Sequence, residues 1–278
     1  MRESQPSSRP RHCLGMSRQP AQPSPFGALL HRWRGHRGLS QLALAAQAGT
    51  TTRHLSFLET GRSRPSQEMV LRVGQALGIP LREQNRLLEA AGLPPVYPEA
   101  DLDDADLAPF RAAIEQLLTA HLPYPAIVLD ERWNVRMANT ACAALFGDGL
   151  VGCNLAHRYF ADPAAAQAMV NWPHVAHAGL DRLRHQLTHH PFDPTLRELV
   201  ALAEAATAGL PRPPLPASEL VACPWFRING QVVRMVGMAA RFDAPTAVIL
   251  DELRIELLYP QDAAAQRFFR HRDHPPLP

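Results

Sequence analysis

The sequence of 278 residues contains no lysine, so its 28 basic residues are all arginine. This absence excludes Schiff-base chemistry at lysine, the lysine of a phosphate-binding loop and the lysine of kinases. No apolar run approaches the length of about 18 residues that a membrane span needs. The N-terminus lacks the apolar segment of a signal peptide. We therefore expect a cytoplasmic protein with no membrane partner.

Cysteine is also scarce, and its spacing indicates neither a zinc site nor a disulfide framework. The four cysteines lie far apart and form no C-x-x-C pair: Cys13, Cys142, Cys153 and Cys223. Free, mostly buried thiols are expected. The sequence also lacks G-x-S-x-G, H-E-x-x-H and G-x-G-x-x-G motifs. These absences predict a protein that is not an enzyme and carries no metal or resident cofactor.

The charge is divided unevenly along the chain, although the formal net charge is only +2. Up to Tyr97 there are 13 arginines against 5 acidic residues, whereas 15 arginines face 21 acidic residues from Pro98 onward. The length is about twice that of a common domain, which predicts two domains. A polyanionic partner is therefore expected for the first part only.

The expected organisation has five segments. Residues 1–23 are rich in Pro, Ser, Arg and Gln and are expected to form a disordered arm. Residues 24–93 form the first domain, 94–121 an acidic linker with a connecting helix near 107–121, 122–265 the second domain, and 266–278 a tail. The linker is indicated by its prolines and acidic residues.

Helix signals are dense in the first domain. Serine or threonine residues that suit N-caps precede apolar residues at helical spacing, and glycines follow the expected helix ends. The expected helices begin at Ser24-Pro25, cover 40–48, 52–60 and 66–77, and end with 81–91. This pattern predicts a compact all-α domain.

The second domain has a mixed α+β pattern. Short strands are expected at 126–129 and 135–138, followed by a helix that Asn139 caps and that ends at Phe146. Helices are expected over 164–206 with breaks near Pro173 and Pro191, and then a proline-rich loop over 209–216. A hairpin around Asn229-Gly230 and a strand over 247–258 complete the prediction.

The helices expected at 40–48 and 52–60 are joined by a short turn at Gly49, which indicates a helix-turn-helix. With Leu55 and Leu58 facing inward, a rotation of about 100° per residue turns another face outward. That face carries Arg53, Ser56 and Phe57, with Thr52 at its edge. In a major groove, Arg53 can bind guanine, Ser56 can bind either base type, and Phe57 can contact a thymine methyl group.

The pairs Ser40-Gln41, Ala48-Gly49 and Leu58-Glu59 resemble the lambda-repressor-like (XRE) helix-turn-helix family. The resemblance implies that Gln41 meets DNA and that Glu59 pairs with Arg34 inside the domain. Arg62 and Arg64 are expected on phosphates, and the helix start suits a phosphate near Thr51. His54 is either a rim contact or solvent-exposed. The candidate DNA-binding residues are Gln41, Thr51, Thr52, Arg53, Ser56, Phe57, Arg62 and Arg64.

The second domain resembles the PAS-like ligand-binding domain of MmyB-like transcription regulators. The residues that carry this resemblance include Asn154-Leu155, Asn171-Trp172, His190-Pro191-Phe192-Asp193 and Phe242-Asp243-Ala244-Pro245. The resemblance implies a pocket for a long apolar molecule, with fatty acids as the suspected class. The candidate lining residues are Trp133, Phe146, Trp172, Trp225 and Phe226, for each of which core packing is the alternative role.

One helix carries a repeat of titratable residues, namely His177, Asp181, His185 and His189. The spacing suits a metal, but the stripe lies opposite the apolar face of Leu180, Leu183 and Leu187. We interpret it as a solvated polar face.

These patterns predict a multidomain protein in which an all-α, five-helix lambda-repressor-like domain precedes an α+β PAS-like domain. The expected function is a transcription regulator that binds double-stranded DNA. A homodimer would place two recognition helices about 34 Å apart on a palindromic operator, and a small apolar ligand would alter their spacing. The alternative is a DNA-binding protein whose second domain serves dimerisation or protein interaction without a small ligand.

Overall fold

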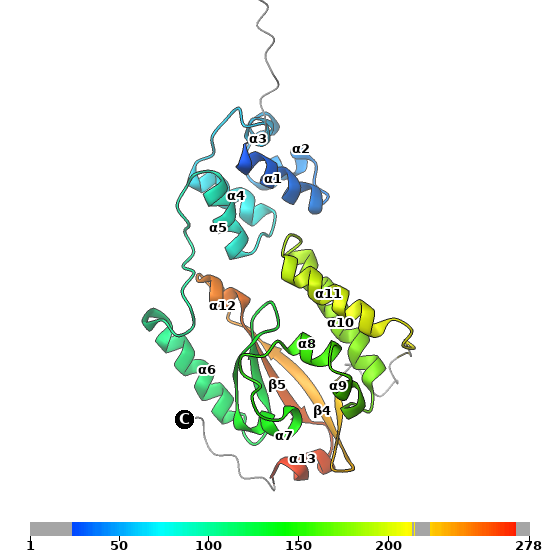
Figure 1. The fold of residues 1–278 in the computed structure, drawn as a ribbon. Coiled ribbons are helices and arrows are strands. Elements are labelled where there is room, and N and C mark those ends of the chain that lie inside the picture. Colours follow the sequence, from blue (N-terminus) through cyan, green and yellow to red (C-terminus); the bar gives the residue numbers. More distant parts are fainter. Residues whose placement is uncertain (1–23, 213, 215–222, 271–278) are drawn as a thin grey trace, which may run out of the picture. The chain divides into compact units, whose positions relative to one another are not determined.

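The computed structural model describes residues 24–212, 214 and 223–270 of the chain (Figure 1). The expected arm at 1–23, which includes Cys13, lies outside the described residues. So do residues 213, 215 and 216 of the expected loop at 209–216 and the last eight residues of the expected tail. The chain divides into two compact units. The first comprises residues 1–77 and 87–93, and the second comprises 78–86 and 94–278. No helix among the described residues is long and apolar enough to cross a lipid bilayer.

The first unit is helical, as predicted. Its helices are α1 (Pro25–His36), α2 (Gln41–Gln47), α3 (Thr52–Glu59), α4 (Gln67–Ala76) and the end of α5 (Leu81–Ala90) from Leu87 onward. The predicted N-caps are confirmed, because a side-chain oxygen accepts a backbone N–H at the start of each of the first four helices. These caps are Ser24, Ser40, Thr51 and Ser66.

Two glycines determine how α1, α2 and α3 meet. Gly49 connects α2 to α3 with a φ of +62°, a left-handed conformation that favours glycine. Gly27 lies against the end of α3, where an added Cβ would stand 2.4 Å from the carbonyl oxygen of Glu59. Leu30, Leu55 and Leu58 are fully buried between these helices. The close approach at Gly27 therefore sets the position of α3.

The second unit contains an antiparallel sheet of five strands among the described residues, in the order β2-β1-β5-β4-β3. The strands are β1 (Ala126–Leu129), β2 (Val135–Ala138), β3 (Trp225–Ile228), β4 (Gln231–Ala240) and β5 (Arg254–Pro260). The last strand lies between the first strand and the hairpin, with Ala126 opposite Leu257 and Ala240 opposite Ile255. The α+β prediction is confirmed.

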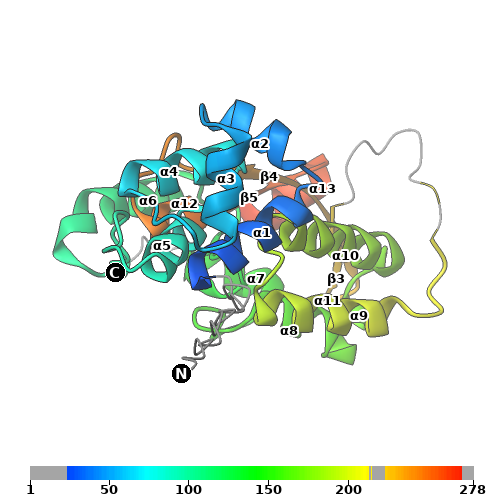
Figure 2. The same cartoon turned by 90° about the horizontal axis from the view of Figure 1, so that it is seen from above.

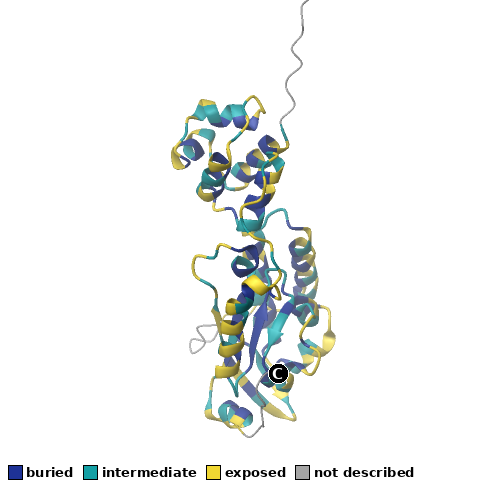
Figure 3. Cartoon of the chain, turned by 90° about the vertical axis from the view of Figure 1, so that its left-hand side faces the viewer, coloured by how far each residue is buried: buried dark blue, intermediate teal, exposed yellow. Residues whose placement is uncertain are grey.

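Helices cover both faces of this sheet (Figure 1). They are α6 (Ala108–Ala120), α7 (Ala143–Phe146), α8 (Leu155–Phe160), α9 (Pro163–Ala168), α10 (Trp172–His189), α11 (Pro194–Thr207), α12 (Val248–Glu252) and α13 (Ala263–Arg270). Successive strand residues point to opposite faces. Ile127 and Leu129 accordingly belong to the core with α8, α10 and α11, and Val128 to the core with α6 and α12. Figure 2 shows α10 and α11 side by side, and Figure 3 shows how deeply the strands are buried.

Two local predictions were wrong. The apolar stretch expected as a strand over 247–258 begins with α12, and β5 starts only at Arg254. Short apolar runs do not distinguish a buried helix from a strand by periodicity alone. Asn139 precedes a 3-10 turn (Thr140–Cys142) rather than the α-helix directly, and its side chain does not cap it. The Asn139 carboxamide instead binds the Ala126 N–H and the Leu118 carbonyl.

The packed second unit extends at both ends of the segment expected for the second domain. Ile114 and Leu118 of α6, within the segment expected as a linker, are buried in the core beside the sheet. Phe269 of α13, within the expected tail, is also fully buried. Apolar residues in these flanking helices therefore contribute to the core of the second unit.

Candidate functional site

The outer face of α3 carries the residues predicted for base contact. Leu55 and Leu58 are fully buried, whereas Arg53 is exposed and Ser56 and Phe57 are half-buried. Thr51 caps the helix by accepting the His54 N–H at 3.1 Å. The helical periodicity expected from the sequence is therefore present.

Phe57 lies beneath two arginines on this face. The Arg53 guanidinium carbon is 5.4 Å from the Phe57 ring centroid, and that of Arg62 is 6.0 Å away. Such cation–π contacts use the flat face of a guanidinium, so its N–H groups at the edge remain directed toward other acceptors. The two arginines lie within an exposed basic surface that extends to Arg64.

Glu59 is the only acidic residue between positions 50 and 64, and it points into the unit. Its predicted pairing with Arg34 is confirmed, because Arg34 Nε and Nη2 donate to its carboxylate at 2.6 and 3.0 Å. His31 Nδ1 lies 3.1 Å from the same carboxylate. The acidic residue is therefore enclosed by donors and does not face a phosphate approaching α3.

Burial by itself raises the pKa of Glu59, but the hydrogen bonds from Arg34, Gln41 and His31 outweigh it and hold this pKa below its usual value. Gln41 Nε2 donates to Glu59 at 2.9 Å, so the structure places this predicted DNA contact inside the carboxylate cluster. His54 is half-buried and lies 3.0 Å from the Thr50 hydroxyl. Thr52 is half-buried at the start of α3.

The second unit contains a cavity of about 300 Å³ between the sheet and α10. Its walls are mostly apolar and include Ile127, Phe146, Val175 and Leu258. Gly179 of α10 also lines the cavity, and the Phe160 ring packs closely against it, because an added Cβ would come within 2.9 Å of that ring. A small, mostly apolar cavity with a few polar groups is typical of a ligand site.

The predicted aromatic residues divide into two groups around this cavity. Trp133 and Phe146 line it. Trp172 and Phe226 are buried in the adjoining core, where they contact Phe160 and Phe146 at ring distances of 6.0 and 5.5 Å. Trp225 is half-buried with the Arg234 guanidinium 4.6 Å from its ring. The structure therefore does not place these last three residues in the cavity wall.

Three polar side chains also line the cavity, and sequence reasoning missed them: Tyr159, Arg182 and Glu256. Arg182 Nη1 donates to Glu256 Oε1 at 2.7 Å, and Arg254 Nη2 lies 3.0 Å from the same oxygen. Burial raises the pKa of the Tyr159 phenol, which remains protonated. Arg254 and Glu256 occupy alternate positions of the otherwise apolar β5, and this pattern is a sequence signal that could have indicated part of the cluster.

Trp133 contacts both the polar cluster of Tyr159, Arg182 and Glu256 and a chain of hydrogen bonds that begins at Gln186. The Arg182 guanidinium carbon lies 3.9 Å from the Trp133 ring centroid, and the indole N–H donates to Gln186 at 2.6 Å. Trp133 has a φ of +66°, a strained conformation for a bulky residue that the Asp130 turn maintains. Strained residues that persist in folded proteins cluster at ligand sites.

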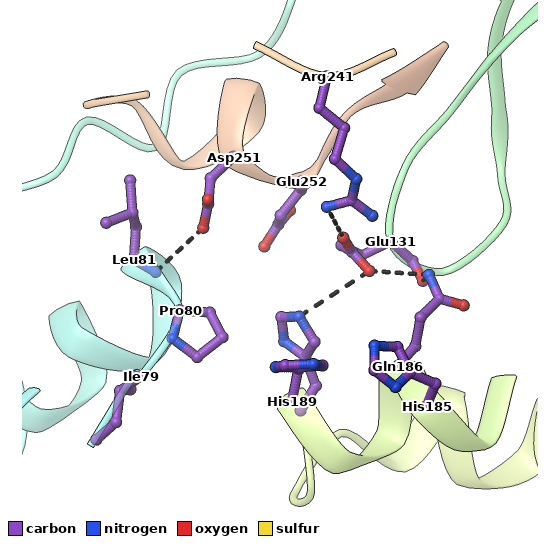
Figure 4. Close-up of a pocket in the computed structure, with 12 residues that line it drawn as sticks. Ile79, Pro80, Leu81, Glu131, His185, Gln186, His189, Arg241, Asp251 and Glu252 are labelled. Carbon is purple, nitrogen blue, oxygen red and sulfur yellow. Dashed lines mark hydrogen bonds and ion pairs between the residues drawn. The ribbon is translucent and has the colours of Figure 1, made fainter. Parts of the chain in front are cut away.

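Beyond Gln186 lies a second cavity, of about 450 Å³, with polar and charged walls (Figure 4). Glu131 accepts from Gln186 at 2.9 Å and from Arg241 at 3.0 Å. The side chains of Asp251 and Glu252 also face it (Figure 4). Its charged walls make it a poor site for an apolar molecule, in contrast to the first cavity.

Comparisons with known proteins match both units. A family model described as a helix-turn-helix matches residues 30–84, and a model described as the ligand-binding domain of MmyB-like transcription regulators matches residues 110–271. Uncharacterized HTH-type transcriptional regulators of Mycobacterium bovis and Mycobacterium tuberculosis are 36% identical to this chain over 115 residues. The match covers 41% of this chain and only 39% of the length of those relatives.

Proposed function

The chain belongs to the family of MmyB-like transcription regulators, and on this premise we propose that it reads a DNA operator through α3 and senses a small apolar ligand in its second unit. Its helix-turn-helix and ligand-binding domain are those of a transcription regulator. Base reading is supported by one observation above all, the outward Phe57 with Arg53 and Arg62 above it. We place this activity in the cytoplasm.

The two arginines have different proposed roles. Arg53 lies within α3, where its N–H groups match the acceptors on the major-groove edge of guanine. Arg62 follows the helix and is proposed to bind phosphate, with Arg64 beside it. Ser56, Phe57, Thr51 and Thr52 complete the proposed interface. Gln41 would join this interface if its amide released Glu59, or through the amide atoms that do not bind Glu59.

Substitution of the two arginines tests these roles once an operator has been selected from random duplexes with the wild-type protein. Arg53→Ala is expected to weaken operator binding by about 1–3 kcal/mol and to relax one base position. Arg62→Ala is expected to weaken selected and random DNA alike and to reduce the salt slope by about 1. Arg184→Ala, an exposed arginine on α10, serves as the control. Equal losses on selected and random DNA for Arg53→Ala would refute base reading.

A homodimer on a palindromic operator is also proposed. The α3 helix has only eight residues and reads one short half-site, so a second copy would supply the remaining specificity. Sedimentation of the complex should then give two chains per duplex, and the selected sites should have half-sites one helical turn apart. One chain on an asymmetric site would contradict this proposal.

The ligand part of the proposal is supported by the apolar walls of the 300 Å³ cavity. Native mass spectrometry of the purified protein should detect a co-purified lipid, with fatty acids as the proposed class. Displacement of N-phenyl-1-naphthylamine, a neutral apolar fluorophore, gives an independent measure of binding. If neither experiment detects a ligand, the alternative is favoured, in which the second unit mediates dimerisation or protein interaction without one.

A further inference from the structure

The chain turns back over α3 at the end of this helix. Gly61 has a φ of +73°, a left-handed conformation that favours glycine. The Arg62 N–H donates to the Phe57 carbonyl oxygen at 2.8 Å. The Gly61 N–H donates to the Leu58 carbonyl oxygen at 3.3 Å. Together with the conformation of Gly61, these two bonds form a Schellman motif, which fixes the backbone of Arg62 against the last turn of α3.

The Phe57 ring is contacted by one arginine from α3 and by another from the loop beyond it. Arg53 precedes Phe57 by four residues, so their side chains are neighbours on the helix surface. Arg62 reaches the same ring because the Schellman motif returns the chain to it. The guanidinium carbons lie 5.4 and 6.0 Å from the ring centroid, at separations where cation–π attraction acts. One ring therefore orders two arginines of different segments.

The surroundings of the two arginines favour a partner with negative charge. Both residues are exposed. Glu59, the only acidic residue between positions 50 and 64, is buried and accepts from Arg34 instead. Two positive charges against one ring repel each other, and this repulsion falls when an anion binds beside them. The phosphates and base acceptors of DNA meet this requirement.

We propose that Phe57 is a positioning residue, which holds Arg53 and Arg62 in the conformations that bind DNA. This inference rests on the proposed reading of an operator by α3. It gives Phe57 a role other than the thymine contact that the sequence predicts. Stacking uses the flat face of each guanidinium and leaves its edge N–H groups for acceptors. Arg53 can then bind a guanine while Arg62 binds a phosphate of the same site.

The ring makes the two contacts depend on each other. A phosphate contact sets the register of the protein on the duplex, and a base contact reads the sequence in that register. Without the ring, Arg53 and Arg62 keep their charges but have more conformations to lose on binding. Ordering one long side chain on binding lowers affinity by about 2- to 10-fold. We therefore expect removal of the ring to weaken both contacts.

The first experiment replaces the ring in the full-length protein and uses the operator selected with the wild type. Phe57→Leu keeps an apolar side chain that can contact a thymine methyl group, but it has no aromatic face. It should weaken binding of the selected operator, measured by fluorescence anisotropy, by about 4- to 100-fold. It should also reduce discrimination at the guanine position that Arg53→Ala relaxes. Phe57→Tyr keeps the ring and should retain this discrimination. Phe110→Leu, at an exposed phenylalanine of α6, serves as the control.

A double-mutant cycle separates positioning from a direct contact. In a protein that already carries Arg53→Ala and Arg62→Ala, the groups that the ring holds are absent. Phe57→Leu should then change operator affinity by less than about twofold. A phenylalanine in direct contact with DNA would cost the same factor in both backgrounds. The measurements use low salt, at which the variants without these arginines still bind. Should Phe57→Leu fail to fold, Phe57→Met takes its place in the cycle.

Three outcomes are distinguishable. A guanine preference that falls in Phe57→Leu and persists in Phe57→Tyr, with no further loss in the protein lacking both arginines, supports the inference. An unchanged preference in Phe57→Leu, a preference lost in Phe57→Tyr, or equal losses in both backgrounds overturns it and leaves operator reading by α3 in place. If the wild type selects no operator, the proposed reading of DNA and this inference fail together.

Discussion

Replacement of Glu59 by glutamine should destabilise the helix-turn-helix while leaving Arg53, Ser56 and Phe57 on the outer face of α3 unchanged. The Glu59 carboxylate is 5% exposed and accepts from Arg34 at 2.6 and 3.0 Å and from Gln41 at 2.9 Å. Glutamine has nearly the same shape, but it offers one acceptor oxygen and directs an NH₂ group toward these donors. The variant therefore tests the charge and the hydrogen bonds rather than the packing.

The expected loss follows from the burial of the pair. Removal of one partner of a buried ion pair costs about 3–5 kcal/mol. Glutamine retains one acceptor and Arg34 keeps its hydrogen bond to the Leu39 carbonyl at 2.8 Å, so we expect about 2–3 kcal/mol. This loss corresponds to about a 30- to 150-fold decrease in the hydrogen-exchange protection of amides in α1–α3.

Hydrogen exchange monitored by mass spectrometry measures this loss in the first unit separately from the second. The pKa of Glu59 is lowered in the folded state, so the stabilisation is present above the unfolded pKa of about 4.3 and is lost as the pH falls through the folded value. The difference in protection between variant and wild type should therefore be full at pH 7 and shrink in acid.

The control variant is Glu68→Gln, at an exposed glutamate on α4, which should change protection little. Unchanged protection in Glu59→Gln, with altered sequence preference on DNA, would refute the structural role.

Two further predictions follow from packing and burial. Gly27→Ala should destabilise the first unit by about 1–3 kcal/mol, because the new Cβ would meet the Glu59 carbonyl. Gly35→Ala on the same helix has open space around the new Cβ and should be neutral or stabilising. Equal melting temperatures of the two variants by circular dichroism would contradict this prediction. Burial raises the pKa of Cys142 to about 12, so iodoacetamide at pH 8 should label the half-buried Cys153 well before Cys142. Peptide mass spectrometry measures the two labelling rates, and equal rates would contradict the buried position of Cys142.

The first unit was predictable because its determinants are local in the chain. Each of its first four helices begins at a serine or threonine whose side chain caps it, and Gly49 provides the left-handed turn between α2 and α3. Capping and helical periodicity act over a few residues, so the outward positions of Arg53 and Phe57 follow from the sequence. The pairing of Glu59 with Arg34 came from family resemblance, and the structure added Gln41 and His31 to it.

The second unit was less predictable because its sheet is assembled from distant segments. The strand β5 lies between β1 and β4, and α12 was mistaken for part of it since a short buried helix and a buried strand are equally apolar. Trp172 and Trp225 were as plausible as Trp133 for lining a pocket. The fold places Trp133 in the cavity wall and leaves Trp172 and Trp225 outside it.

The sequence by itself therefore determined the helical order of the first unit, the outward residues of α3 and the separation of a basic from an acidic part, since these depend on local propensity and on composition. The tertiary structure alone decided where the second unit is hollow and which charges meet there. Arg182 and Glu256 are 74 residues apart in the chain, and neither residue attracts attention alone. Folding brings them within 2.7 Å of each other in the wall of a mostly apolar cavity. Burial there removes much of the hydration of the charged groups, so the ion pair between them must replace it.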